Sequence, residues 1–225
     1  MPSRKIVLAK GELYHVFNRG NAKQPIFLQK RDYQRFLKTV SFYQFVSPPI
    51  RLSKFLILSK ERRVDLLKNL TWNDKKLVEI ACYCFMPNHF HFLIKQVGDC
   101  GISEFIGQIQ NSYTKYFNVK RERVGSLLQG RFKAVRIESE EQLIHLSRYI
   151  HLNPYSSFIV KSLEGLKKYP WSSFLSYLED KKVDFLDENI VLNLFKNRGE
   201  YQKFVFNQAD YQRELEKIKH LTLDL

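Results

Sequence analysis

Two apolar, β-prone runs separated by a two-residue break constrain the fold of this chain most strongly. The first run covers residues 78–86, the second covers residues 89–94, and Pro87-Asn88 lies between them. Strands joined by so short a connection pair with each other, so the two runs predict a β-hairpin.

The second run carries a histidine pair. His89 and His91 alternate with Phe90, so on a strand both imidazoles face one side of the sheet while Phe90 packs on the other. At strand rise their Cα atoms lie about 6.6 Å apart, which lets two imidazoles converge on one metal ion. The alternative is two polar residues on the solvent face of a half-buried strand.

Apolar periodicity and turn residues predict the remaining elements. They are a strand over 13–17 with a turn over 18–21, a helix over 31–45, short helices within 50–77, a helix over 102–117, a partial strand within 127–137, a helix over 140–153 and two helices within 187–225. Strands and helices mix without regular β-α-β alternation, which predicts an α+β fold with a central antiparallel sheet flanked by helices.

The helix over 140–153 offers a second group of reactive side chains. A capping box over 139–142 begins it, and Pro154 is expected to end it, leaving the Asn153 carboxamide free at the C-terminal cap. Tyr149 and Asn153 are spaced i, i+4 and therefore share one face. A tyrosine can act as a covalent nucleophile, and a metal ion can polarise its target. The alternative is a core tyrosine beside an Asn cap.

Other histidines and tyrosines are less suited to chemistry. Tyr113 and Tyr116 belong to an apolar helical stripe, which favours packing in the core. His151 is expected to point away from Tyr149, on the opposite side of the same helix. His15 and His145 are isolated in the sequence, so we interpret them as structural or surface residues.

Charge favours a polyanionic partner. The 225 residues include 37 Lys and Arg against 23 Asp and Glu, a formal net charge of +14. Such a balance favours nucleic acid, and interleaved aromatics such as Phe132 can stack on unpaired bases. The alternative is a solvated basic surface. The chain has no apolar run long enough to span a membrane, and its three cysteines are expected to be reduced thiols in a cytoplasmic protein.

Five motifs occur in a fixed order and carry a family resemblance. They are YHVFNRGN (14–21), MPNHFH (86–91), QGRFK (129–133), YIHLNP (149–154) and YPWSS (169–173). Together they resemble the HUH single-tyrosine transposases of the IS200-like superfamily, and within it the REP-associated tyrosine transposases. The resemblance covers residues 11–178.

The resemblance implies a fold and an activity. The fold is the HUH-nuclease sheet, which is ferredoxin-like. His89, His91 and Asn153 would hold a divalent metal, Mg²⁺ or Mn²⁺, and Tyr149 would be the nucleophile. The enzyme would cleave single-stranded DNA near hairpins, form a 5′-phosphotyrosine link with a free 3′-OH, and rejoin strands by the reverse step. Because two imidazoles also suit Zn²⁺, the residues alone leave the metal open.

The family pattern also divides the chain. Residues 1–179 are expected to form the catalytic domain, with a basic insertion over 47–77, and residues 180–225 a helical C-terminal extension. The basic residues expected to contact DNA are Arg19, Arg121, Arg123, Arg131, Lys133, Arg136 and Arg148.

Two functions therefore compete. The first is a metal-dependent single-tyrosine transposase acting on single-stranded DNA with hairpin or palindromic elements, as a monomer or homodimer, in the cytoplasm and associated with the nucleoid. The second is a catalytically retired regulatory protein that binds DNA or RNA hairpins. Both predict salt-sensitive binding. Retention of His89, His91, Tyr149 and Asn153 together favours the enzyme.

Overall fold

A four-stranded antiparallel sheet forms the centre of the molecule. A computed structural model describes residues 7–46, 48–72, 76–180 and 182–223. The strands are β1 (Leu13–Arg19), β2 (Val78–Met86), β3 (His89–Gln96) and β4 (Lys133–Arg136), in the order β2-β3-β1-β4. The hairpin of β2 and β3 is confirmed, with Met86 opposite His89.

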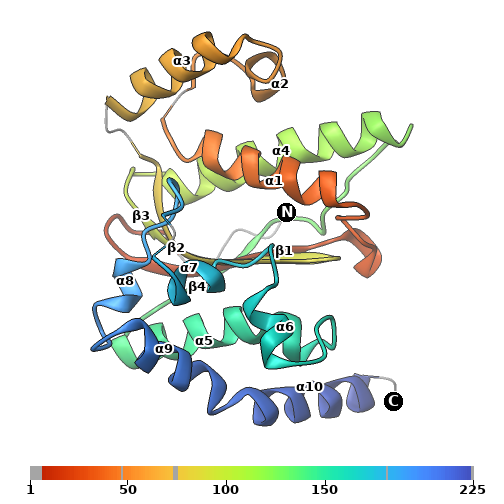
Figure 1. Cartoon of the computed structure of the whole chain (residues 1–225). Coiled ribbons are helices and arrows are strands. Elements are labelled where there is room, and N and C mark those ends of the chain that lie inside the picture. The colour runs from red at the N-terminus through yellow and green to blue at the C-terminus, as the bar shows by residue number, and fades with distance from the viewer. Residues whose placement is uncertain (1–6, 47, 73–75, 181, 224–225) are drawn as a thin grey trace.

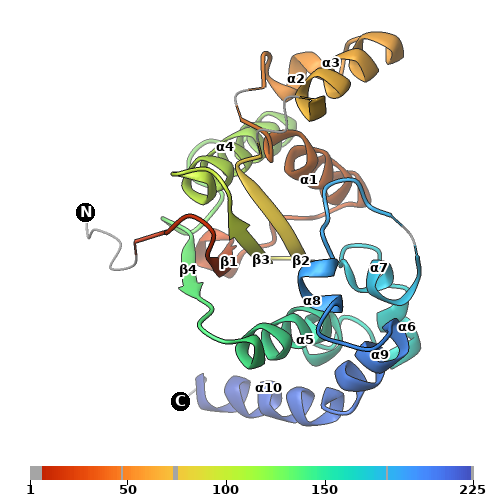
Figure 2. The ribbon, with the colours of Figure 1, turned by 90° about the vertical axis from the view of Figure 1, so that its left-hand side faces the viewer.

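Helices cover both faces of this sheet. Helices α1 (Lys30–Tyr43) and α4 (Gly101–Lys120) lie on one face, and α5 (Glu140–Ser156) lies on the other (Figure 1 and Figure 2). Burial on both faces explains why β2 is a nearly continuous apolar run instead of an alternating one. The predicted α+β class, with its antiparallel sheet and helical C-terminal part, is confirmed.

The other helices are short, apart from α3 and two near the C-terminus. They are the 3₁₀ turn η1 (Asn21–Lys23), α2 (Leu52–Phe55), α3 (Lys60–Trp72), α6 (Leu163–Lys167), α7 (Phe174–Leu178), α8 (Asn189–Leu192), α9 (Arg198–Phe206) and α10 (Ala209–Leu223). The C-terminal segment thus has the two expected helices, α9 and α10, and the extra turn α8. Within the described residues, no helix is both long and apolar enough to span a bilayer.

The segment predicted as a basic insertion forms one short helix, α2, and one longer helix, α3. Helices α2 and α3 lie beyond α1, away from the sheet (Figure 1). A small apolar cluster of Phe42, Leu52 and Phe55 joins them to α1. Residues 47 and 73–75 of the insertion lie outside the described part of the chain. The division into a catalytic domain and an extension stays a prediction.

The ends of β1 and α1 are among the element boundaries that differ from the sequence prediction. Strand β1 continues to Arg19, so the predicted turn starts only at Gly20, because Asn18 and Arg19 pair with Phe90 and His89 of β3. Helix α1 ends at Tyr43, two residues before the predicted end.

The predicted end of the helix that carries Tyr149 is wrong. Ser139 caps the start of α5 as expected, accepting a hydrogen bond from the Gln142 N–H (3.2 Å). The helix continues through Pro154 to Ser156, however, so Asn153 lies inside the helix and not at its cap. A proline this near the end forfeits only its own hydrogen bond, and the Ser157 N–H still reaches the Asn153 carbonyl (3.0 Å).

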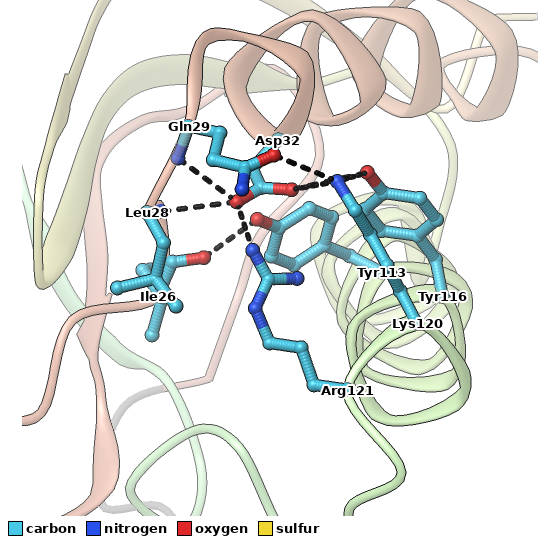
Figure 3. A network of polar contacts seen from close by, with 8 residues as sticks. All are labelled: Ile26, Leu28, Gln29, Asp32, Tyr113, Tyr116, Lys120 and Arg121. Carbon is cyan, nitrogen blue, oxygen red and sulfur yellow. Dashed lines mark hydrogen bonds and ion pairs between the residues drawn. The ribbon is translucent and has the colours of Figure 1, made fainter.

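A fully buried carboxylate joins α1 to α4. Asp32, in the first turn of α1, has no side-chain exposure. Its oxygens accept hydrogen bonds from the N–H groups of Leu28 (3.0 Å) and Gln29 (3.1 Å) and from the Tyr116 hydroxyl (3.0 Å), and pair with Lys120 (3.1 Å) and Arg121 (2.6 Å) (Figure 3). Burial raises the pKa of Asp32, but the Leu28, Lys120 and Tyr116 hydrogen bonds and the Arg121 charge outweigh it, so the pKa is lowered.

Removing this carboxylate is expected to destabilise the fold. Asp32→Ala leaves two cations without their buried anion, and losing one partner of a buried ion pair costs about 3–5 kcal/mol. Urea denaturation measures this change in the free energy of unfolding. Asp99→Ala, at a carboxylate whose side chain is 93% exposed, is the control and should change it by less than about 0.5 kcal/mol. A loss below about 1 kcal/mol for Asp32→Ala contradicts the expectation.

Candidate functional site

The pairing of β1 with β3 gathers histidines on one face of the sheet. Phe17 lies opposite His91 and Arg19 opposite His89, so the odd-numbered side chains of β1 share the face of both β3 histidines. The His89 and His91 rings have centroids 4.9 Å apart, and His15 stacks on His91 at 5.1 Å.

His15 holds the ring of His91. The His15 Nε2 and His91 Nδ1 atoms lie 2.9 Å apart and share one hydrogen bond. Burial lowers the pKa of His15 to about 4, and burial followed by the charges of His89 and His15 lowers that of His91 well below its ordinary value. Both rings are therefore neutral near pH 7, so one proton lies between them. This leaves the Nε2 atom of His91 for another partner.

Asn88 holds the ring of His89 in the same way. His89 Nδ1 donates to Asn88 Oδ1 (2.6 Å), while Asn88 Nδ2 donates to the Lys23 carbonyl (3.2 Å). The Nε2 atom of His89 is thus left as an acceptor. Burial lowers the pKa of His89. A hydrogen bond with the Asn153 side chain raises this pKa, and the Arg19 charge lowers it.

Helix α5 places Tyr149 and Asn153 against this histidine face. The Tyr149 ring meets His91 and His15 edge-on, with centroid distances of 5.7 Å and 6.1 Å. Asn153 Nδ2 donates to the Tyr149 carbonyl (3.0 Å), as i, i+4 spacing allows. The four predicted site residues therefore lie together, from β3 and α5. Their assigned roles stay predictions.

The opposite face of α5 is fixed by a buried polar group. His151 points away from Tyr149, as expected, and hydrogen-bonds the Tyr201 hydroxyl (2.7 Å) and Ser173 Oγ (2.8 Å). Burial lowers the pKa of His151 to about 3, so this ring is neutral. These bonds fix the rotation of α5 and hence the direction of Tyr149.

Helix α10 also reaches the tyrosine. It packs along α5 (Figure 1 and Figure 2), and Gln212 Nε2 donates to the Tyr149 carbonyl (3.3 Å). A cavity of about 250 Å³ lies between the two helices, with Tyr149, Arg148, Tyr211 and Glu216 in its lining. The C-terminal extension therefore borders the candidate site, which the sequence did not indicate.

The donor set suits a divalent cation. Two neutral imidazoles lie on one face with their centroids 4.9 Å apart, and each has its Nδ1 atom hydrogen-bonded, as metal-binding histidines usually are. The amide oxygen of Asn153 is the third candidate ligand, and oxygen ligands suit Mg²⁺ and Mn²⁺. The described residues contain no cluster of three or more His, Cys, Asp or Glu arranged for a metal, so this site depends on the amide.

Two of the predicted DNA-contacting residues lie on the histidine face. Arg19 is exposed at the end of β1, opposite His89. Lys133 begins β4 opposite Phe17 and therefore shares its face.

The other predicted DNA-contacting residues have protein partners or lie in a loop. Arg121 pairs with Asp32 (2.6 Å), Arg123 with Asn118 Oδ1 (3.0 Å), Arg136 with Glu12 (2.8 Å) and Arg148 with His145 (2.6 Å), while Arg131 is exposed before β4. The fully buried partner of Arg121 favours a structural role for that residue.

Two residues of the site were missed by sequence reasoning. The sequence predicts that His15 is a structural or surface residue and that Asn88 is part of a turn. The alternation of His15, Phe17 and Arg19 along a strand was the available signal. It becomes informative only once β1 is known to pair with β3.

Comparison with known proteins agrees with this geometry. The family model for IS200-like transposases matches residues 43–153. The matched segment spans just under half of the chain, and over this segment the chain resembles the IS200-like transposases. The matched segment contains the histidine pair, Tyr149 and Asn153, while His15 and Arg19 precede it.

A solved structure shows the same fold. It is the REP-associated tyrosine transposase bound to a REP hairpin, which is similar to this chain with a TM-score of 0.53 and 15% sequence identity. The match covers 83% of this chain and 98% of that chain. No curated protein matches the sequence.

Proposed function

We propose that this chain is an IS200-like transposase that cleaves and rejoins single-stranded DNA near hairpins through Tyr149. His89, His91 and Asn153 would hold the divalent cation, Mg²⁺ or Mn²⁺. The observation that carries the proposal is the convergence of these four side chains from β3 and α5, with both imidazoles oriented by hydrogen bonds.

The proposed step is a transesterification. The Tyr149 hydroxyl oxygen bonds to the scissile phosphorus, and the bond from phosphorus to the 3′ oxygen breaks. The 3′ oxygen leaves as a hydroxyl, so the proton lost by the phenol is balanced by the one that the leaving group gains. One phosphodiester replaces another, which makes the step reversible without ATP.

The protein contributes orientation and charge. Helix α5 aims the phenol, and His15 and Asn88 keep the Nε2 atoms of His91 and His89 toward the phosphate. When bound, the divalent cation supplies Lewis-acid polarisation of a phosphoryl oxygen. The low pKa values of the histidines keep the rings neutral and able to act as ligands at pH 7.

Charge and shape support a hairpin substrate. The net charge is +14, and the similar solved structure holds a REP hairpin. We propose that this chain belongs to the REP-associated branch and binds such hairpins, with the basic helices α2 and α3 as an additional DNA contact.

The test is detection of the covalent intermediate. Purified protein is incubated with Mn²⁺ and end-labelled single-stranded DNA carrying hairpins from the sequence around its own gene. A labelled band of protein–DNA adduct is expected on a denaturing gel. A chelator present during the reaction should prevent the adduct from forming. Tight hairpin binding by gel shift without an adduct at any metal concentration overturns the enzyme in favour of a retired hairpin-binding protein.

We expect His15 to affect metal-dependent adduct formation, although it is not one of the proposed metal ligands. His15→Phe keeps a ring that stacks on Phe17 and meets Tyr149 edge-on, but it removes the hydrogen bond to His91. Losing such an orienting partner costs about 10–100-fold in metal affinity or activity. A Mn²⁺ titration of adduct formation should shift to higher concentration by that factor. His15→Gln, which keeps a hydrogen-bonding group, should lie nearer the wild type, and equal shifts for both variants contradict the orienting role.

A further inference from the structure

An arginine and a glutamine are paired beside the candidate metal ligands. Arg19 ends β1 opposite His89, on the histidine face. Its Nε atom donates to Gln129 Oε1 over 2.6 Å.

A bulge in the sheet places Gln129 over Arg19. Strands β1 and β4 pair in register from Tyr14 opposite Arg136 to Phe17 opposite Lys133. Regular continuation would set Gly20 opposite residue 130, yet Gly20 pairs with Leu128, so the segment before β4 holds two extra residues. Bulges of this kind redirect side chains next to active sites.

The bulge is anchored on both sides. Leu127 and Leu128 are buried, the Asn21 N–H donates to the Leu127 carbonyl (2.9 Å), and the Gln129 N–H donates to the Arg19 carbonyl (2.8 Å). Gly130 follows with a φ of +51°, a conformation in the left-handed region that favours glycine. The amide of Gln129 is therefore held over Arg19 by the backbone.

This arrangement orients the guanidinium group. Its Nε atom is bound by Gln129, and within the described residues no hydrogen bond or ion pair joins its two Nη nitrogens to a protein group. Two parallel N–H donors on a fixed plane match two phosphate oxygens, which an ammonium group does not reproduce.

We propose that Arg19, oriented by Gln129, binds a non-bridging oxygen of the scissile phosphate and offsets the negative charge that develops as Tyr149 attacks. Gln129 is a positioning residue. The inference rests on the proposed function, because the phosphate that Tyr149 attacks must lie beside His89, and Arg19 is the cation paired with His89 across the strands.

The first test separates catalysis from binding. The rate of adduct formation is measured at saturating protein, and the affinity for the same hairpin DNA by gel shift. Arg19→Ala should lower the rate by about 100–1,000-fold, as loss of a charge-stabilising donor does, with an affinity within about threefold of wild type. A rate within threefold of wild type, or a loss explained by affinity alone, overturns the proposal.

Three further variants test the pair. Arg19→Lys keeps the charge but not the bond to Gln129, and should fall between Arg19→Ala and wild type. Gln129→Ala should lower the rate about tenfold alone, and not at all in an Arg19→Ala background, because it acts through Arg19. Lys10→Ala removes an exposed charge beyond the other end of β1 and should leave the rate unchanged.

A neutral linkage identifies the phosphate. A methylphosphonate is placed in turn at each of the two positions next to the scissile phosphate. The ratio of wild-type to Arg19→Ala rates should stay large at both neighbours, whereas collapse of the ratio at a neighbour overturns the assignment to the scissile phosphate. Absence of any adduct with wild-type protein contradicts the proposed function itself, whereas a wild-type adduct with an unaffected Arg19→Ala variant contradicts only this inference.

Discussion

Replacing Tyr149 by phenylalanine is expected to abolish the covalent protein–DNA adduct. The substitution removes only the hydroxyl oxygen that would bond to phosphorus. The measurement is the adduct band on a denaturing gel, with Mn²⁺ and hairpin-bearing single-stranded DNA.

The same variant should fold and bind DNA. A phenylalanine ring keeps the edge-on contacts with His91 and His15, and the hydrogen bonds from Asn153 and Gln212 go to the backbone carbonyl of residue 149. We therefore expect an unfolding free energy within about 1 kcal/mol of wild type and an affinity for the hairpin within about threefold.

A matched control is available in the same cavity. Tyr211, on α10, also lines the cavity beside Tyr149 but is 65% exposed. Tyr211→Phe should form the adduct at the wild-type rate. Retention of the adduct by Tyr149→Phe would remove Tyr149 as nucleophile, and a loss confined to Tyr211→Phe would transfer the role to α10.

The parts of this site that sequence spacing predicts are those set by local geometry. His89 and His91 share a face because a strand repeats every two residues, and Tyr149 and Asn153 share a face because a helix brings i and i+4 together. Both conclusions depend only on local secondary structure and not on the tertiary structure of the rest of the chain. The hairpin around Pro87-Asn88 was equally local.

The parts that spacing misses depend on distant segments. His15 reaches His91 only because β1 and β3 pair in one particular register, and Gln129 reaches Arg19 only because two extra residues precede β4. Asp32 is buried between two helices, where a charged residue at the start of a helix usually faces water. Such contacts follow from tertiary pairing.

The end of α5 shows a local rule overridden. Proline disfavours helical geometry in the preceding residue, yet Asn153 is helical. Leu152, Pro154 and Tyr155 are all buried, so packing against the sheet and α10 retains the last turn. This extension matters for the site because it holds the Asn153 side chain one turn from Tyr149 and toward His89.

Removing either β3 imidazole is expected to eliminate metal-dependent cleavage. His89→Ala and His91→Ala each delete one of three proposed ligands, so the loss in Mn²⁺ affinity should exceed the 10–100-fold expected for an orienting residue such as His15. Calorimetric titration with Mn²⁺ measures the affinity without DNA, and adduct formation measures the activity. Hairpin affinity in the absence of metal should stay within about threefold of wild type.

The two variants should differ in stability. His91 is only 5% exposed and is bonded to His15, so its truncation leaves a cavity and an unpartnered imidazole, at a cost of about 1–3 kcal/mol. His89 is half-buried, and its truncation should cost less. His91→Gln retains a polar side chain in place of the ring, so it separates loss of the ligand from loss of packing. If Mn²⁺ titrates both alanine variants as it does the wild type, the ion lies elsewhere, and the paired histidines have a structural role beside Tyr149.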